Sequence, residues 1–216
     1  DELENAKKAG LKVQRIIFAT DALSIVVNET NPLKEITVED AGAIFAGKIK
    51  NWKELGGSDS AISLYGRQSN SGTFTFFRDQ VVKADYSPDL KAMNGNSQIV
   101  EGVAQDKAAI GYVGIGYAID TKTKKPAKGL KLLKVAAKKG EKAVDPMDLK
   151  SILAGKYPIA RPLYQYFVNP SPQLVKFLKF ELGAEGRKAV SQEGFYDLRG
   201  EWRHENEKTF KEISGS

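Results

Sequence analysis

The 216-residue sequence contains no cysteine and a single histidine, His204. Without cysteine, the chain has no disulfide scaffold, thiolate zinc site, iron–sulfur cluster or cysteine nucleophile. One histidine excludes metal sites built on two histidines, and a Ser-His-Asp triad would depend on His204, which lies among charged residues. No pair of carboxylates in an apolar setting indicates acid–base chemistry. We therefore expect no enzyme activity, no bound metal and no cofactor.

The sequence also has no hydrophobic run long enough to cross a bilayer. Its longest apolar stretch, from Ile16 to Val27, is interrupted by three polar residues, whereas a spanning helix needs about 20 apolar residues. The chain begins Asp-Glu-Leu-Glu and shows no signal-peptide pattern there. We expect a mature product or a fragment.

The composition, with 41% hydrophobic and 28% charged residues, is that of a globular protein with one large domain or two small ones. A net charge of +6 raises the question of a nucleic-acid partner. Nine lysines lie between Thr121 and Lys142, but no aromatic residue accompanies them to stack on bases. We expect a solvated, lysine-rich hairpin and no nucleic-acid partner, although the positive charge attracts anions.

Hydrophobic periodicity alternates between the strand type and the helix type, which predicts an α/β fold with largely parallel sheets. Strands are expected at residues 13–19 and 22–27 (one long strand or two), 61–65, 109–113 and 163–168. Helices are expected at 2–9, 73–83 and 184–193, after the N-caps Thr37, Ser97 and Ser171, and from Asp145-Pro146 to Leu153.

The loop between the strand at 61–65 and the helix at 73–83 carries the clearest chemical signal. The first N–H groups of a helix have no intrahelical partner and carry partial positive charge. Gly72 permits close approach of the backbone, and Ser71 and Thr73 add hydroxyl donors. Arg67 can offer a planar guanidinium to two oxygens of a tetrahedral oxyanion. The loop therefore predicts an oxyanion site.

Two alternatives to this interpretation concern the same loop. A plain serine N-cap with a surface arginine upstream fits these residues equally well. A nucleotide-triphosphate loop is disfavoured, because no lysine follows Gly72. Ser69 and Asn70 are second-tier candidates for contact with the anion.

Several further strings occur in the order found in one protein family. They are Thr20–Asn28 followed by Asn31-Pro32, Ile44–Trp52 (IFAGKIKNW), Ala109–Gly114 (AIGYVG) and Tyr157–Tyr164 (YPIARPLY). Together with the loop from Arg67 to Thr73, they give a sequence that resembles the phosphate-binding protein of the ABC phosphate importer over most of the chain.

The resemblance implies a type II periplasmic-binding-protein fold, in which two α/β lobes joined by two crossing strands close on phosphate. Residues 22–161 would form a complete second lobe that carries the oxyanion loop, and residues 1–21 and 162–216 a partial first lobe. The implied phosphate contacts are Arg67, Ser71, Gly72 and Thr73. The implied function is capture of inorganic phosphate for an ABC transporter permease, in the periplasm or at the cell surface through a lipid anchor upstream of this chain.

The resemblance fails at the start of the chain. Family members begin with strand–helix units that supply further donors and an acidic residue that accepts the ligand's proton, and these have no counterpart here. We therefore expect a fragment or part of a split protein, with weak affinity for phosphate. Apolar side chains should be exposed at Ile16, Phe18, Leu163 and Phe167, which would favour pairing with a separate N-terminal fragment or a second copy. The alternative function is a sensor, adhesin or scaffold domain with little ligand affinity.

Other residues have both a functional and a structural interpretation. Lys48, Asn51 and Trp52 could form a functional patch, but a tryptophan after a helix stop is more typical of a packing anchor. Tyr112 and Tyr117 could line the cleft or lie at the edge of the core. The C-terminal segment 199–216 is expected to be a charged, solvated helix or extension.

Overall fold

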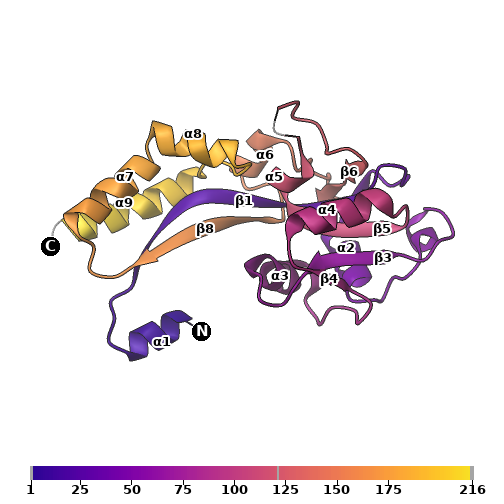
Figure 1. Ribbon diagram of the computed structural model, residues 1–216, viewed down its shortest axis with the longest axis horizontal. Helices are drawn as coiled ribbons and strands as arrows, with labels where there is room; N and C mark the ends of the chain where they lie inside the picture. Colours follow the sequence, from indigo (N-terminus) through magenta and orange to yellow (C-terminus); the bar gives the residue numbers. More distant parts are fainter. Residues whose placement is uncertain (1, 121, 215–216) are drawn as a thin grey trace. The chain divides into compact units, whose positions relative to one another are not determined.

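The computed structural model describes residues 2–120 and 122–214, and the chain divides into two compact units. Unit 1 comprises Asp1–Asp21 with Arg161–Ser216, and unit 2 comprises Ala22–Ala160. Strand β1 (Gln14–Asn28) is continuous through the boundary between Asp21 and Ala22 (Figure 1). Within the described ranges, no helix is both long and apolar enough to span a membrane.

Unit 2 is built on a mixed sheet with the strand order β4-β3-β5-β1-β6. Its strands beside β1 are β3 (Ser63–Arg67), β4 (Lys91–Met93), β5 (Ala109–Gly114) and β6 (Leu130–Leu132). β3 runs parallel to β4 and β5, but β1 is antiparallel to β5 and β6. The prediction of a largely parallel sheet is therefore wrong for β1, because hydrophobic periodicity does not show from which end a strand enters a sheet.

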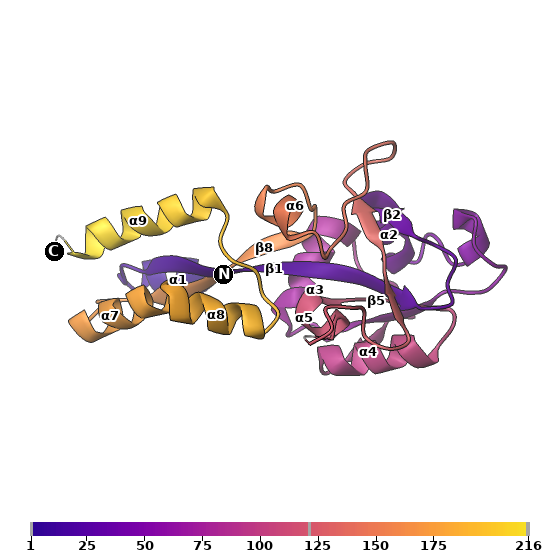
Figure 2. The same cartoon turned by 90° about the horizontal axis from the view of Figure 1, so that it is seen from above.

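The two faces of this sheet are covered by different helices. α4 (Asn96–Gln105) lies on one face and α2 (Val38–Phe45) on the other (Figure 2). The core on the α4 side consists of Val26, Tyr65, Ile99, Val103, Ala109, Val113, Ala118 and Leu130. On the α2 side, the ring of Tyr112 stacks on Phe77 with centroids 4.0 Å apart and meets Phe45 edge-on at 5.3 Å. Successive residues of β5 thus serve the two cores alternately, as the pleat requires.

The sequence predicted the first residues of some helices correctly and of others wrongly. The hydroxyl of Thr37 accepts a hydrogen bond from the N–H of Asp40 at 2.9 Å, which confirms it as the N-cap of α2. α4 begins at Asn96 after Gly95, so the prediction of Ser97 as its cap is wrong. The helix start expected at Asp145-Pro146 is also wrong, because Asp145 accepts from the N–H of Met147 in a turn, but the predicted end at Leu153 is confirmed. That helix, α6 (Leu149–Leu153), starts only after the N-cap Asp148.

The remaining elements of unit 2 are short. They are β2 (Glu35–Thr37), β7 (Lys134–Ala136), the 3-10 helix η1 (Trp52–Leu55), α3 (Gly72–Phe77), the π-helix η2 (Arg78–Val82) and α5 (Ile115–Ala118). The lysine-rich segment does not form one hairpin, because β6 pairs with β1 whereas β7 pairs with β2. Its second part is nevertheless a hairpin-like loop, which an antiparallel bridge between Val135 and Val144 closes around three of the lysines. Thr121, at one end of that segment, lies outside the described residues.

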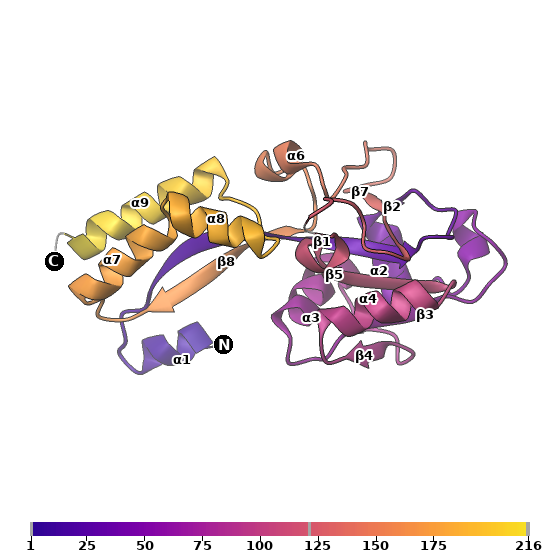
Figure 3. The same cartoon turned by 45° about the horizontal axis from the view of Figure 1, so that its top comes forward.

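Unit 1 contains the first part of β1, the strand β8 (Ala160–Phe167) paired with it and, among its described residues, four helices. The helices are α1 (Glu2–Lys8), α7 (Pro172–Glu181), α8 (Ala184–Gln192) and α9 (Gly200–Ser214). Within this unit, α7, α8 and α9 lie on one side of the strand pair and α1 on the other (Figures 1 and 3).

α9 is docked on β1, so the prediction of a solvated tail is wrong. The side chain of Asn206, 4% exposed, accepts from the N–H of Ile17 at 2.8 Å and donates to its carbonyl at 2.7 Å. Arg15 adds an ion pair with Glu205 at 2.9 Å. Ile16, which was expected to be exposed, is fully buried in the core. A mid-helix asparagine thus supplies the backbone partner that a neighbouring strand would otherwise provide.

A buried ion pair joins the two strands of unit 1. Arg161 Nη2 and Nε lie 2.9 and 3.0 Å from Asp21 Oδ2, and the Asp21 side chain is only 6% exposed. Burial raises the pKa of Asp21, and the positive charge of Arg161 opposes that rise without cancelling it.

Candidate oxyanion-binding site

Three helices of unit 2 begin at the same edge of its sheet. The parallel strands β3, β4 and β5 end at Arg67, Met93 and Gly114, and Arg67 pairs in register with Met93. α3, α4 and α5 follow these strand ends, and the arrowhead of β3 points towards α3 (Figure 1). The carboxyl edge of parallel strands is where open α/β sheets bind ligands, and helix N-termini favour anions there.

The loop between β3 and α3 is a structured turn. The N–H of Ser71 donates to the carbonyl of Gln68 at 3.0 Å, and the Ser71 hydroxyl accepts from the N–H of Thr73 at 3.2 Å. Ser71 is therefore the N-cap of α3, as the simpler interpretation requires, and its hydroxyl proton is still available to donate elsewhere. Gly72 is exposed, and no atom lies within 4 Å of the position that a Cβ would take there. Ser69 and Asn70 are exposed at the tip of the loop.

Arg67 is not the surface arginine of the simpler interpretation. Its side chain is half-buried, and Nη1 donates to Oδ1 of Asn96, the first residue of α4, at 3.3 Å. Arg67 Nε is buried and has no hydrogen-bond partner, and no ion pair to Arg67 occurs in the part of the chain that the structure describes. A buried donor without a partner costs about 1–3 kcal/mol. Arg67 thus has a buried donor without a partner and no carboxylate neighbour among the described residues.

Tyr112, which the sequence placed either in the cleft or at the edge of the core, supports the backbone of Arg67. The hydroxyl of Tyr112 accepts from the backbone N–H of Arg67 at 3.2 Å. Tyr112 itself is fully buried, so its body belongs to the core, whereas Tyr117 is 51% exposed. Gly66 makes this approach feasible, because a Cβ at Gly66 would lie 2.9 Å from Tyr112 Cε1.

Asn96 is a residue of the candidate site that the sequence did not indicate. Its side-chain oxygen contacts the Arg67 guanidinium from the start of α4. The available signal was the Asn94-Gly95-Asn96 cluster between a short strand and a helix, which marks a second strand end at the same edge.

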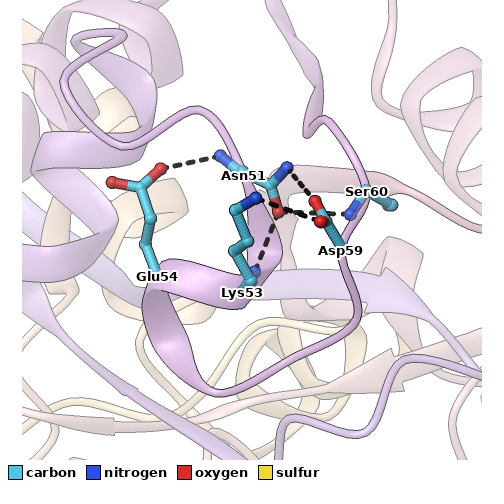
Figure 4. Close-up of polar contacts among 5 residues, drawn as sticks. All are labelled: Asn51, Lys53, Glu54, Asp59 and Ser60. Carbon is cyan, nitrogen blue, oxygen red and sulfur yellow. Dashed lines mark hydrogen bonds and ion pairs between the residues drawn. The ribbon is translucent and has the colours of Figure 1, made fainter.

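The polar residues of the Asn51 loop form hydrogen bonds with one another, which is a structural role (Figure 4). The side-chain oxygen of Asn51 accepts from the N–H groups of Lys53 and Ser60, and its amide donates to Asp59 at 2.8 Å. Glu54 accepts from the N–H of Asn51 at 2.9 Å, which completes a capping box. These contacts satisfy the backbone at the start of η1.

Trp52, which follows Asn51, is a packing anchor. It is 1% exposed, and its Nε1 donates to the carbonyl of Ala108 at 2.9 Å. The structural interpretation of this string therefore accounts for both residues.

The fold matches a defined class of protein. Residues 1–185 match the family described as the PBP superfamily domain, and the chain belongs to that superfamily. Its α/β architecture corresponds to the periplasmic-binding-protein-like fold that the sequence predicted.

More particular similarities are to proteins named for phosphate. The chain is 32% identical over 211 residues to the phosphate-binding protein PstS of Pseudomonas aeruginosa, an alignment that covers 89% of this chain and 62% of the relative. A solved structure from Clostridium perfringens with bound phosphate superposes with a TM-score of 0.73 at 26% identity, covering 90% of this chain and 75% of that one. An ABC-type phosphate transport receptor from Vibrio cholerae gives 0.70 at 26% identity, with 85% and 72% covered.

Proposed function

We propose that the chain is the phosphate-binding part of an extracytoplasmic solute receptor for an ABC importer. The observation that carries the proposal is the edge formed by β3, β4 and β5. Arg67, without a carboxylate partner among the described residues, lies there with the N-termini of α3 and α4. The names of the PstS relative and of the Vibrio receptor support phosphate as the anion.

The proposed contacts are the Arg67 guanidinium, the Ser71 and Thr73 hydroxyls and the backbone at Gly72. All of these can donate hydrogen bonds, as an oxyanion requires. This is binding rather than catalysis, and we assign the chain no reaction. The receptor would work in the periplasm, or at the cell surface on a lipid anchor, and would pass phosphate to a membrane permease.

Titration with inorganic phosphate tests this proposal directly. Because one charge-assisted contact contributes about 1.5–3 kcal/mol and each neutral hydrogen bond about 0.5–1.5 kcal/mol, we expect the 216-residue chain to bind phosphate weakly, with a Kd on the order of 1 mM. Nuclear magnetic resonance would show saturable shifts of the amides of residues 67–74. Sulfate should compete, because the proposed contacts include no carboxylate to accept a ligand proton. Absence of saturable shifts would contradict the site, and calorimetric binding at micromolar Kd would contradict the expected weakness.

We also propose a polypeptide partner for the free edge of β8. In the described ranges β8 is paired with β1 alone, and none of its residues is fully buried. Tyr166 and Val168 are 49% and 40% exposed and line an apolar groove of about 580 Å³ together with Leu3 and Leu11. A free edge beside an apolar groove favours the addition of a strand, either from a separate N-terminal fragment or from a second copy of this chain.

Light scattering should therefore show concentration-dependent self-association. A Tyr166→Lys substitution should weaken this association, because it places charge on the edge and in the groove. Lys176→Glu, on the exposed surface of α7, is a control that should leave it unchanged. A strictly monomeric protein at high concentration would count against the second-copy form of the proposal.

A further inference from the structure

Next to the candidate site, the buried Tyr112 and the half-buried Tyr86 connect the two ends of its loop. Tyr112 meets the backbone N–H of Arg67, the last residue of β3, at 3.2 Å. The hydroxyl of Tyr86 lies 3.0 Å from the carbonyl of Phe74 in the first turn of α3. The two tyrosine hydroxyls are themselves 3.0 Å apart.

The number of protons that each group can donate fixes the direction of this chain of hydrogen bonds. The Phe74 carbonyl can only accept, so Tyr86 donates its single hydroxyl proton to it. The bond between the two hydroxyls is then donated by Tyr112, whose oxygen accepts from the Arg67 N–H. Each proton is used once, and the chain runs in one direction from the start of the loop to its end. Bonds aligned in this way polarise and strengthen one another in a low-dielectric interior.

The surroundings keep both hydroxyls neutral and in place. The pKa values of Tyr112 and Tyr86 are both raised, chiefly by burial, so neither hydroxyl loses its proton at physiological pH. The Tyr112 ring stacks on Phe77 at 4.0 Å, and the Tyr86 ring lies 4.4 Å from that of Phe74.

We propose that Tyr86 and Tyr112 act together as positioning residues for the oxyanion loop, holding Arg67 and the first turn of α3 at a fixed separation. This inference rests on the proposed function, because the loop is positioned for the anion that it would bind. Neither tyrosine needs to touch the ligand. Their effect is to keep the donors of the loop organised before the anion arrives, which lowers the entropic cost of binding.

The test uses the full 216-residue chain and the variants Tyr86→Phe and Tyr112→Phe, which remove one hydroxyl each and keep the rings. Because one hydrogen bond contributes about 0.5–1.5 kcal/mol, each variant should raise the Kd for inorganic phosphate by roughly two- to tenfold. In Tyr112→Phe, the Arg67 amide should exchange its hydrogen faster by a similar factor even without phosphate. The double variant should lose no more affinity than the weaker-binding single variant, because either substitution interrupts the same row of hydrogen bonds.

Tyr65→Phe is the matched control. Tyr65 lies on β3 but faces α4, and its hydroxyl donates to Asp106 and accepts from Lys91, away from the loop. This variant should lose stability yet keep the wild-type Kd, whereas a general loss of packing would weaken all three variants.

Two different failures would be distinguishable. If the wild-type chain shows no response to phosphate, the proposed function fails. Exchange of the Arg67 amide still tests the positioning role of the two tyrosines in that case. If Tyr112→Phe keeps both the wild-type Kd and the wild-type exchange of the Arg67 amide, the positioning role is overturned. Multiplicative losses in the double variant would equally overturn the claim that the two tyrosines act as one unit.

Discussion

Replacing Arg67 by methionine is expected to remove measurable phosphate binding while the fold is retained. Charge-assisted hydrogen bonds contribute about 1.5–3 kcal/mol, so the affinity should fall by roughly 10- to 100-fold. The methionine keeps the apolar stem that packs at the half-buried position. It also removes the buried Nε that has no partner among the described residues. The melting temperature should therefore stay the same or rise slightly, and phosphate titration followed by magnetic resonance would measure the loss.

Arg78→Met provides the control for net charge. Arg78 lies in the π-helix that follows α3, and its Nε is paired with Asp79 at 2.8 Å on the surface. This variant loses the same charge from the same unit but should keep the wild-type Kd. Equal losses in the two variants would mean that overall charge, rather than the Arg67 guanidinium, attracts the anion.

Among the substitutions proposed for this chain, Arg161→Met should lower the free energy of unfolding most. The substitution leaves Asp21, 6% exposed at its side chain, without its ion-pair partner. Breaking a buried pair by removing one member costs about 3–5 kcal/mol. Urea denaturation at neutral pH should show this loss, and the double variant Asp21→Asn/Arg161→Met should recover much of it. A single variant as stable as the wild type would show that the pair contributes nothing.

The same variant has a predictable dependence on pH. Burial already raises the pKa of Asp21 in the folded state, so folding favours the protonated form. That contribution is fully present below the unfolded-state pKa and is lost as pH rises through the folded pKa. Removal of Arg161 raises the folded pKa further. The difference in unfolding free energy between variant and wild type should therefore shrink on acidification, and a difference that grows would contradict the assignment to Asp21.

Signals carried by neighbouring residues were predicted well from the sequence. Thr37 caps α2 and Ser71 caps α3 because each side chain bonds an N–H two or three residues ahead. The same reasoning failed at Asp145, where a turn competes for the same kind of side-chain bond. The loop from Arg67 to Thr73 could be proposed as a site because its signal lies in a short segment.

Contacts between distant residues were not predictable in this way. Asn96 and Tyr112 reach Arg67 from 29 and 45 residues away, and only the pairing of β3 with β4 and β5 brings them together. Asn206 sits in a charged helix and was assigned to solvent, because nothing near it in the sequence indicates the strand that it bonds.

The bond between Asn206 and Ile17 joins residues 189 positions apart, and it orders events during synthesis. Unit 2 is one uninterrupted stretch, Ala22–Ala160, and can fold as soon as it leaves the ribosome. The N-terminal half of β1 precedes unit 2 in the sequence, but it must wait for α9, which follows unit 2. A stalled or prematurely terminated chain would thus present a finished unit 2 attached to a bare strand, which is a substrate for chaperones and proteases.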